Sequence, residues 1–361
     1  MTLSPYDLEI YRNVLSSIAE EMGEILVRAG FSPNIKERRD YSCALFAGDG
    51  EMIAQAAHIP IHLGSMSFAV RAVIDEPDIK EGDIFILNDP FRGGTHLPDV
   101  TCIEPVFFGE KIEFYTASRA HHADIGGLTP GSMPISTSIE QEGILIPPSR
   151  LYRRGKLNKP LFKRITEATR DPEERRGDFE AQIGALELGR KRLRETADKY
   201  SLKILKEAGR TLLDYSEKIM RSVIAEIPDG TYRYMDYMDG DGTGTERIPV
   251  RLALTIEGEE ALVDFRGSSQ QVKGCLNAPL SVTTAAALYV FQCLAPPEIP
   301  LNSGPLRVID IIVDDNSLLN AKFPAAVVGG NVETSQRIVD VVFGALSKII
   351  PDKIQAASAG S

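Results

Sequence analysis

Apolar side chains recur at helical spacing over the first part of the chain. They lie at Leu8, Tyr11, Leu15, Ile18, Met22, Ile25 and Leu26, mostly three or four positions apart. Ser4 precedes this stripe as a helix cap, Pro5 suits the first helical position, and Asp7 stands where a capping-box acid would. Gly30 ends the pattern, as glycine commonly does after a helix. The pattern predicts a packing helix.

Two short apolar segments then predict a hairpin. Segments 42–47 and 51–56 flank the sequence Gly-Asp-Gly at 48–50, which is a strong turn signal. A second helix is expected at about 65–75.

Two further apolar segments, 83–87 and 111–120, predict buried strands. The first runs directly into Asn-Asp-Pro at 88–90, and the second ends at His121 and His122. Both strands therefore deliver polar residues at their C-terminal ends, where binding sites commonly lie.

The rest of the chain changes character twice. Segment 150–159 is basic and polar, and it predicts a connection between domains. Segment 166–225 is charged and helical, and 228–230 is a turn. The elements expected beyond that turn are strands at 231–238, 248–256 and 260–265, a helix at 282–294, a strand at 306–313 and a helix at 336–349.

These elements predict an α+β (mixed α/β) fold in three parts. We expect an N-terminal αβ domain at 1–150, a helical section at 151–227, and a strand-rich αβ domain at 228–361. The small residues at 356–361 form no closing element, so the last domain is expected to be truncated at its C-terminus.

Composition is that of a globular protein. Of the 361 residues, 43% are hydrophobic and 25% charged, and the net charge is −11. This charge disfavours a nucleic-acid or anionic-membrane surface. No apolar run reaches the roughly 18 residues of a membrane span, and the N-terminus lacks a signal-peptide layout. We expect a cytoplasmic protein.

The scattered cysteines, Cys43, Cys102, Cys275 and Cys293, predict reduced, mostly buried thiols.

All five histidines lie in one 65-residue window, at 58, 62, 96, 121 and 122. Asp89 and Asp99 lie in the same window, Asp40 precedes it, and Asp124 follows it. Imidazole and carboxylate groups together are the ligand set of Zn, Mn or Fe(II). The clustering therefore predicts a divalent-metal site.

Segment 88–99 is the densest part of this window. Two adjacent glycines let its backbone turn, and Pro90 and Pro98 stiffen its ends. A stiff loop would hold His96 and Asp99 as a ligand pair. The alternative is a surface loop whose aspartates only form Asx turns.

His121 and His122 are adjacent, so on a strand they face opposite sides. His122 would then share a face with Asp124, and His121 would point away. One histidine could bind metal while the other orients it or acts as acid or base. Two hydrogen-bonded core histidines are the alternative. Asp40 could likewise be a cap or a salt-bridge partner.

His58 and His62 do not form the helical zincin pattern, because Pro60 lies between them. A structural and a functional pair remain open there. There is no phosphate-binding G-x-x-x-x-G-K-[ST] loop, so no ATP site is evident. The glycine-rich segment 239–245 lacks the EF-hand glutamate, because Val250 takes that place, and it predicts a hairpin loop.

Several motifs resemble the hydantoinase B family. They are E-R-R-D-Y-S-C-A (37–44), H-I-P-I-H-L-G (58–64), N-D-P-F-R-G-G-T-H-L-P-D (88–99), A-H-H-A-D-I-G-G (120–127) and N-S-G-P-L-R (302–307). This family includes the B-type component of N-methylhydantoinase, the C-terminal half of 5-oxoprolinase, caprolactamase and the metal-bearing subunit of acetone carboxylase. Its members usually continue past residue 360.

The resemblance implies a metal-dependent hydrolytic subunit of an ATP-dependent cyclic-amide hydrolase. A hydantoinase A-type subunit, carrying ATP and Mg, phosphorylates the substrate, and the intermediate passes to this chain within a hetero-oligomer. The resemblance implies Asp40, His96, Asp99 and His122 as metal ligands, with His121 and Asp124 in catalytic roles. The alternatives are an acetone-carboxylase-like subunit and a non-catalytic scaffold for the ATPase subunit.

Overall fold

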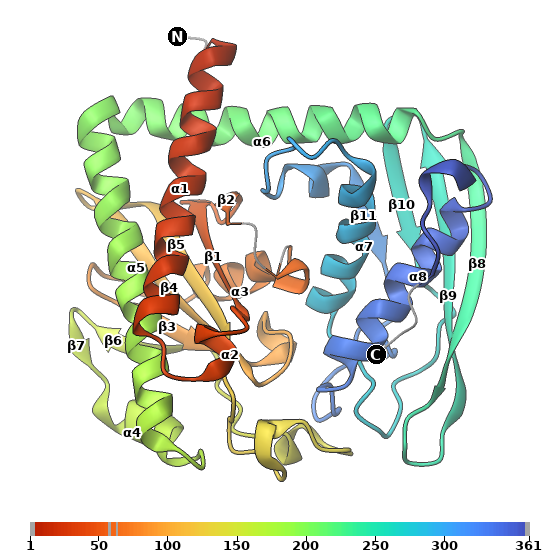
Figure 1. Ribbon diagram of the computed structural model, residues 1–361, viewed down its shortest axis with the longest axis horizontal. Helices are drawn as coiled ribbons and strands as arrows, with labels where there is room; N and C mark the ends of the chain where they lie inside the picture. The colour runs from red at the N-terminus through yellow and green to blue at the C-terminus, as the bar shows by residue number, and fades with distance from the viewer. Residues whose placement is uncertain (1–3, 57–58, 63, 358–361) are drawn as a thin grey trace.

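The computed structural model describes residues 4–56, 59–62 and 64–357. Its elements form two halves that lie side by side, and the long helix α6 (Leu202–Ala225) runs along one edge of both (Figure 1). The first half contains a seven-stranded sheet and the second a four-stranded sheet. This arrangement confirms the predicted α+β class. The predicted boundaries at residues 150 and 227 remain a prediction.

The first sheet is antiparallel, in the order β2-β1-β5-β4-β3-β6-β7. Its strands are β1 (Tyr41–Ala47), β2 (Met52–Gln55), β3 (Ile84–Leu87), β4 (Asp99–Phe108), β5 (Lys111–His121), β6 (Ser149–Arg153) and β7 (Lys156–Leu157). The predicted hairpin is confirmed by β1 and β2. The prediction that segment 150–159 is a connection between domains is wrong. This segment contains β6 and β7, and β6 pairs with β3 and with β7 inside the first sheet. The basic residues of that segment lie on the exposed edge hairpin.

Strand β4 is not predicted by the apolar pattern. Pro105 lies inside it, and an internal proline argues against a strand when only the sequence is considered. In the fold, β4 is held between β5 and β3, and Pro105 lies opposite Tyr115. Tertiary pairing therefore overrides the local signal.

Helices cover one face of this sheet. The predicted N-terminal helix is confirmed as α1 (Pro5–Ala29), and the Ser4–Asp7 capping box is formed in both directions. It packs beside α5 (Pro172–Tyr200), which also contacts β4 and β5. The predicted helical segment 166–225 breaks at Ser201, where φ is 76°. The shorter helices are α2 (Pro33–Lys36), α3 (Ser65–Ile74) and α4 (Lys159–Glu167). No helix within the described ranges is long and apolar enough to cross a membrane.

The second half begins after α6. Its strands pair in the order β11-β10-β9-β8, and β11 runs parallel to β10. The elements are β8 (Gly230–Gly240), β9 (Glu246–Glu257), β10 (Glu260–Asp264), α7 (Leu280–Leu294), β11 (Ile309–Ile312) and α8 (Ser335–Leu346). A π-helical turn, η6 (Gly330–Thr334), leads directly into α8.

Strands β1 to β5 of the first sheet are largely buried on both faces. Cys43 and Leu45 belong to the core under α1 and α5, whereas Ala44 and Phe46 belong to the core shared with the second half. Alternate residues of a strand point to opposite faces, so the sheet separates two cores. The face that carries Ala44 and Phe46 therefore lies against the second half.

Candidate metal centre

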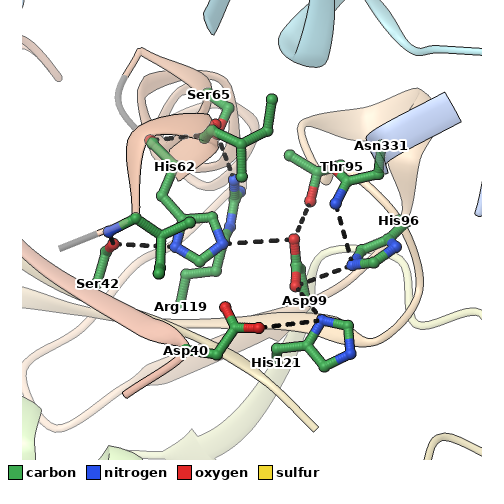
Figure 2. A network of polar contacts seen from close by, with 12 residues as sticks. Asp40, Ser42, His62, Ser65, Thr95, His96, Asp99, Arg119, His121 and Asn331 are labelled. Carbon is green, nitrogen blue, oxygen red and sulfur yellow. Dashed lines mark hydrogen bonds and ion pairs between the residues drawn. The ribbon is translucent and has the colours of Figure 1, made fainter. Parts of the chain in front are cut away.

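Strand register brings three predicted site residues together. Strands β1, β5 and β4 are neighbours in the sheet, and His121 at the end of β5 pairs with Asp99 at the start of β4. Asp40 immediately precedes β1, and its carbonyl oxygen accepts a hydrogen bond from the His121 amide at 2.9 Å. Figure 2 shows the three side chains gathered at this end of the sheet. The positions are far apart in sequence, but they lie on adjacent strands.

Asp99 is the centre of this cluster. Its Oδ1 lies 3.1 Å from Nδ1 of His121 and 3.0 Å from Nε2 of His96, while Thr95 donates to Oδ2 at 2.7 Å. Asp40 Oδ2 lies 3.9 Å from Nδ1 of His121. His96 and Asp99 are each 1% exposed, so this is not the surface loop of the alternative interpretation.

The loop that carries His96 is stiff, as the sequence predicts. Asp89 accepts a hydrogen bond from the Phe91 amide at 2.9 Å and caps a short helical turn, η2 (Pro90–Arg92). Gly93 follows with φ of 102°, and a Cβ there would lie 2.6 Å from the carbonyl oxygen of Phe68. Asn88 donates to the carbonyl oxygens of residues 97 and 144. These contacts hold His96 in place before any ligand arrives.

The donor atoms of His96, Asp99 and His121 all lie within 4.8 Å of one another. Two imidazoles and a carboxylate are a common ligand set for Zn, Mn or Fe. Nδ1 of His96 is buried without a hydrogen-bond partner among the described residues. Nε2, not Nδ1, is the nitrogen that faces Asp99, so the argument for a metal rests on the donor set and not on this unpartnered atom. The residues therefore fit a divalent metal.

Electrostatics favour an ionised Asp99. Burial raises the pKa of this carboxyl, but the charge of His96 and hydrogen bonds from His121, His62 and His96 hold it well below its usual range. Burial lowers the pKa of His121, yet the hydrogen bond and charge of Asp99 raise it above the ordinary value. An ionised carboxylate is the form that binds a metal.

His62 also belongs to this cluster, although its motif left a functional role open. Its Nδ1 lies 2.9 Å from Oγ of Ser42, and its Nε2 lies 3.4 Å from Oδ2 of Asp99. The short helical turn η1 (Pro60–His62) places it there. His58, its predicted partner, lies outside the described residues.

The structure does not bring His122 into the cluster. It faces α5, where it lies between Arg175 and Gln182 and stacks near Phe179 at a ring separation of 4.4 Å. Burial, and then the charge of Arg175, lower the pKa of His122 to about 3. The two histidines face opposite sides as predicted, but His121 rather than His122 is on the side of His96. Adjacent residues of a strand always point to opposite faces. Which of the two histidines faces the cluster depends on what packs against each face.

Asp124, for which the resemblance implies a catalytic role, bonds to Arg170 and Ser132 and to no histidine among the described residues. Its carboxylate accepts hydrogen bonds from the Arg170 backbone amide at 2.7 Å, the Arg170 guanidinium at 2.8 Å and Ser132 at 2.9 Å. These bonds outweigh the effect of burial, which raises the pKa of Asp124, and hold it below its usual value. Asp124 anchors a loop.

Two further residues border the cluster. Asn331, from η6 in the second half, places Nδ2 3.3 Å from Nε2 of His96. Arg119 is fully buried and donates to Thr101, Ser65 and the carbonyl oxygen of Gly93. Asn331 is 235 positions from His96, so no local pattern relates them. Arg119 stands two positions before His121, and an arginine inside an apolar strand is a signal that sequence inspection could use.

Comparison with known sequences gives a consistent result. The family model for hydantoinase B/oxoprolinase matches residues 4–361. An uncharacterised protein of Methanocaldococcus jannaschii is 42% identical over 98% of this chain and 63% of its own length. A 5-oxoprolinase of Dictyostelium discoideum is 39% identical, covering 95% of this chain and 28% of that protein. The putative B-type component of a D-/L-hydantoinase from a Pseudomonas species is 30% identical over 98% of this chain and 63% of its own. The chain thus spans less than two thirds of each relative.

Solved structures share the fold. An ATP-dependent caprolactamase from Pseudomonas jessenii superimposes with a TM-score of 0.91 at 29% identity, over 98% of this chain and 62% of that chain. Nucleotide-free acetone carboxylase superimposes with a TM-score of 0.88 at 18% identity, over 98% of this chain and 50% of that chain. At that lower identity the likeness concerns the fold alone.

Proposed function

The chain belongs to the hydantoinase B/oxoprolinase family, and from that premise we propose that it is the hydrolytic component of an ATP-dependent enzyme that opens cyclic amides. The observation that carries this proposal is the convergence of His96, Asp99 and His121 at one buried point. The relatives named as 5-oxoprolinase, as a hydantoinase component and as caprolactamase support the substrate class.

ATP would be used by a separate hydantoinase A-type component. The sequence contains no phosphate-binding G-x-x-x-x-G-K-[ST] loop, and one relative is named as the B-type component of a hydantoinase. The partner, with its own Mg, would phosphorylate the amide oxygen, because an unstrained amide is a poor electrophile. One water then adds across the C–N bond, and a second water accounts for release of the transferred phosphoryl group as phosphate.

A divalent metal, Zn, Mn or Fe, would be held by His96, Asp99 and His121. When bound, it would act as a Lewis acid and lower the pKa of a water molecule. Asp99 is kept ionised for this role by the histidines around it. His62 and Thr95 hydrogen-bond to the same carboxylate and fix its orientation. Such supporting contacts tune a metal site.

Asp40 has a different position in the cluster. Its side chain is 32% exposed, whereas those of His96 and Asp99 are 1% exposed. We assign it to the open side, where its Oδ2 would accept a proton from the attacking water. A carboxylate near the nucleophile is a common general base.

The test is reconstitution with the A-type component. The pair is co-expressed, and ring opening of 5-oxoproline, hydantoins and caprolactam is followed with and without ATP. We expect ATP-dependent product only when both components are present, and loss of product with His96→Ala. Product formed by the A-type component alone, or unchanged turnover with His96→Ala, would refute the proposal. Elemental analysis of the same preparations checks the metal.

A further inference from the structure

The side chain of Asn331 reaches the cluster from the second half of the molecule. In Figure 2 it approaches His96 from the side opposite Asp40 and His121. Its Nδ2 lies 3.3 Å from Nε2 of His96, the same nitrogen that lies 3.0 Å from Asp99. The Asn331 side chain therefore borders the space where the three donor groups converge.

The oxygen of the Asn331 side-chain amide has no partner among the residues that the structure describes. Oδ1 of Asn331 is buried and accepts no hydrogen bond from any described residue. Burial of an amide oxygen without a hydrogen-bond partner destabilises the protein, unless a ligand supplies the missing donor. If the positions of Oδ1 and Nδ2 in the Asn331 side chain were exchanged, Nδ2 would be the buried atom without a hydrogen-bond partner. If Nε2 of His96 binds a metal, it can no longer contact Asn331, and the whole amide is then free for a ligand.

The backbone holds Asn331 firmly in this position. It lies in η6, and π-helical turns are often found at functional sites. A Cβ at the preceding Gly330 would lie 1.9 Å from the carbonyl oxygen of Asn277, so only glycine allows this approach. The carbonyl oxygen of Asn331 accepts a hydrogen bond from Ser335 at 2.8 Å.

The first half secures the same segment. The buried carboxylate of Glu142 accepts hydrogen bonds from the amides of Val327 at 2.9 Å and Val328 at 3.1 Å. The backbone N–H of Asn331 in turn donates a hydrogen bond to the carbonyl oxygen of Val327 at 3.3 Å. The backbone that carries this side chain is thus held by contacts from both halves. Rigidly held donors are effective where negative charge develops on an oxygen.

We propose that Asn331 is a substrate-binding residue whose Nδ2–H donates a hydrogen bond to the oxygen that water adds to the reacting acyl carbon, and afterwards to the carboxylate of the ring-opened product. Every cyclic amide yields such a carboxylate, so this contact is independent of ring size. The inference rests on the proposed function and adds a substrate contact from the second half. Asparagine side chains can serve in this way in acyl-transfer sites.

The test uses the complex with the A-type component, loaded with Co²⁺ as a visible probe of the metal site. Acetate is titrated as a carboxylate probe and inorganic phosphate as a second anion, and the cobalt spectrum gives a dissociation constant for each. We expect Asn331→Ala to weaken acetate binding at least tenfold, or by about 1.4 kcal/mol, because a hydrogen bond to a charged group is lost. Cobalt affinity should be unchanged.

Two further variants complete the experiment. Asn331→Asp keeps the shape but removes the donor, so it should also weaken acetate binding. Asn320→Ala is the matched control, because Asn320 is similarly buried but contacts Asp315 and Lys322. It should bind both probes like the wild type. Turnover of Asn331→Ala should fall about 100-fold or more, the usual effect of removing such a donor.

Three outcomes would overturn the inference. Acetate affinity that is unchanged in Asn331→Ala removes the proposed contact. A loss confined to phosphate would place Asn331 on phosphoryl oxygens instead. A fall in cobalt affinity that accounts for the whole effect would make it a metal-site residue. If the wild type takes up no cobalt, the proposed function itself fails, which is a different result from a silent Asn331 variant.

Discussion

Oε1 of Gln182 lies 2.9 Å from Nε2 of His122, and this contact determines which nitrogen of His122 carries the proton. Gln182 donates through Nε2 to the carbonyl oxygens of Val100 and Ser118, so its Oε1 must be the atom that faces His122. Nε2 of His122 therefore donates, and Nδ1 accepts from Arg175 at 2.8 Å. Both nitrogens are occupied.

The first prediction separates the two adjacent histidines. His121→Ala should abolish stoichiometric metal, because His121 shares the donor cluster with His96 and Asp99. His122→Asn should retain metal, because His122 faces α5 instead. Elemental analysis of the folded, purified variants measures both, and circular dichroism checks folding. Greater metal loss in His122→Asn than in His121→Ala would contradict the assignment of the cluster.

The second prediction concerns His62. It supports Asp99 through its Nε2 and is itself held by Ser42. His62→Ala should weaken metal affinity about 10–100-fold without preventing binding at high metal concentration, as is typical for a group that orients a ligand. Competition with a chelator measures the affinity. Ser42→Ala should show a smaller loss in the same direction, and an affinity equal to wild type in both variants would argue against this role.

The third prediction concerns Asp124. Its carboxylate ties the loop after β5 to Arg170 and Ser132. Asp124→Ala should lower the free energy of unfolding by about 1–3 kcal/mol, because the charged hydrogen bonds are lost. It should also speed proteolysis within 125–146, while metal affinity stays the same. Asp124→Asn, which keeps an acceptor for Ser132, should be milder. Metal loss in either variant would contradict this structural role of Asp124.

The fourth prediction is a pH dependence from Glu142. Burial raises the pKa of this carboxyl to about 7, against an ordinary value of 4.5, despite hydrogen bonds from Ser136, Val328 and Val327. A group whose pKa is raised on folding stabilises the protein below its unfolded pKa, and that contribution is lost as the pH rises to about 7. Glu142→Gln cannot ionise. The unfolding free energy of Glu142→Gln, minus that of wild type, should therefore rise by on the order of 3 kcal/mol from pH 5 to pH 8.

Urea unfolding of both proteins at the two pH values measures this difference. Glu104 also has a pKa raised to about 7 by burial, but it is unchanged in both proteins, so its effect cancels. A stability difference between wild type and Glu142→Gln that is the same at pH 5 and pH 8 would contradict the prediction.

Local pattern was sufficient for elements whose signals are short-range. The capping box at Ser4 and the apolar stripe behind it are features of one helix, and α1 follows them. The glycine-containing turn between β1 and β2 is equally local. The same holds for the loop carrying His96, where glycine and proline restrict the backbone itself. Strand β4 and the edge hairpin β6–β7 depended on pairing partners, and local pattern missed both.

The chemistry divides in the same way. Residue types and their clustering along the chain are enough to predict a histidine–aspartate metal site, and the predicted ligands include His96 and Asp99. Which neighbour joins them was set by packing. Alternation places His121 and His122 on opposite faces, but only strand order puts His121 beside Asp99 and α5 against His122. Asn331 entered for the same reason, since a contact across 235 positions exists only once the two halves have packed together.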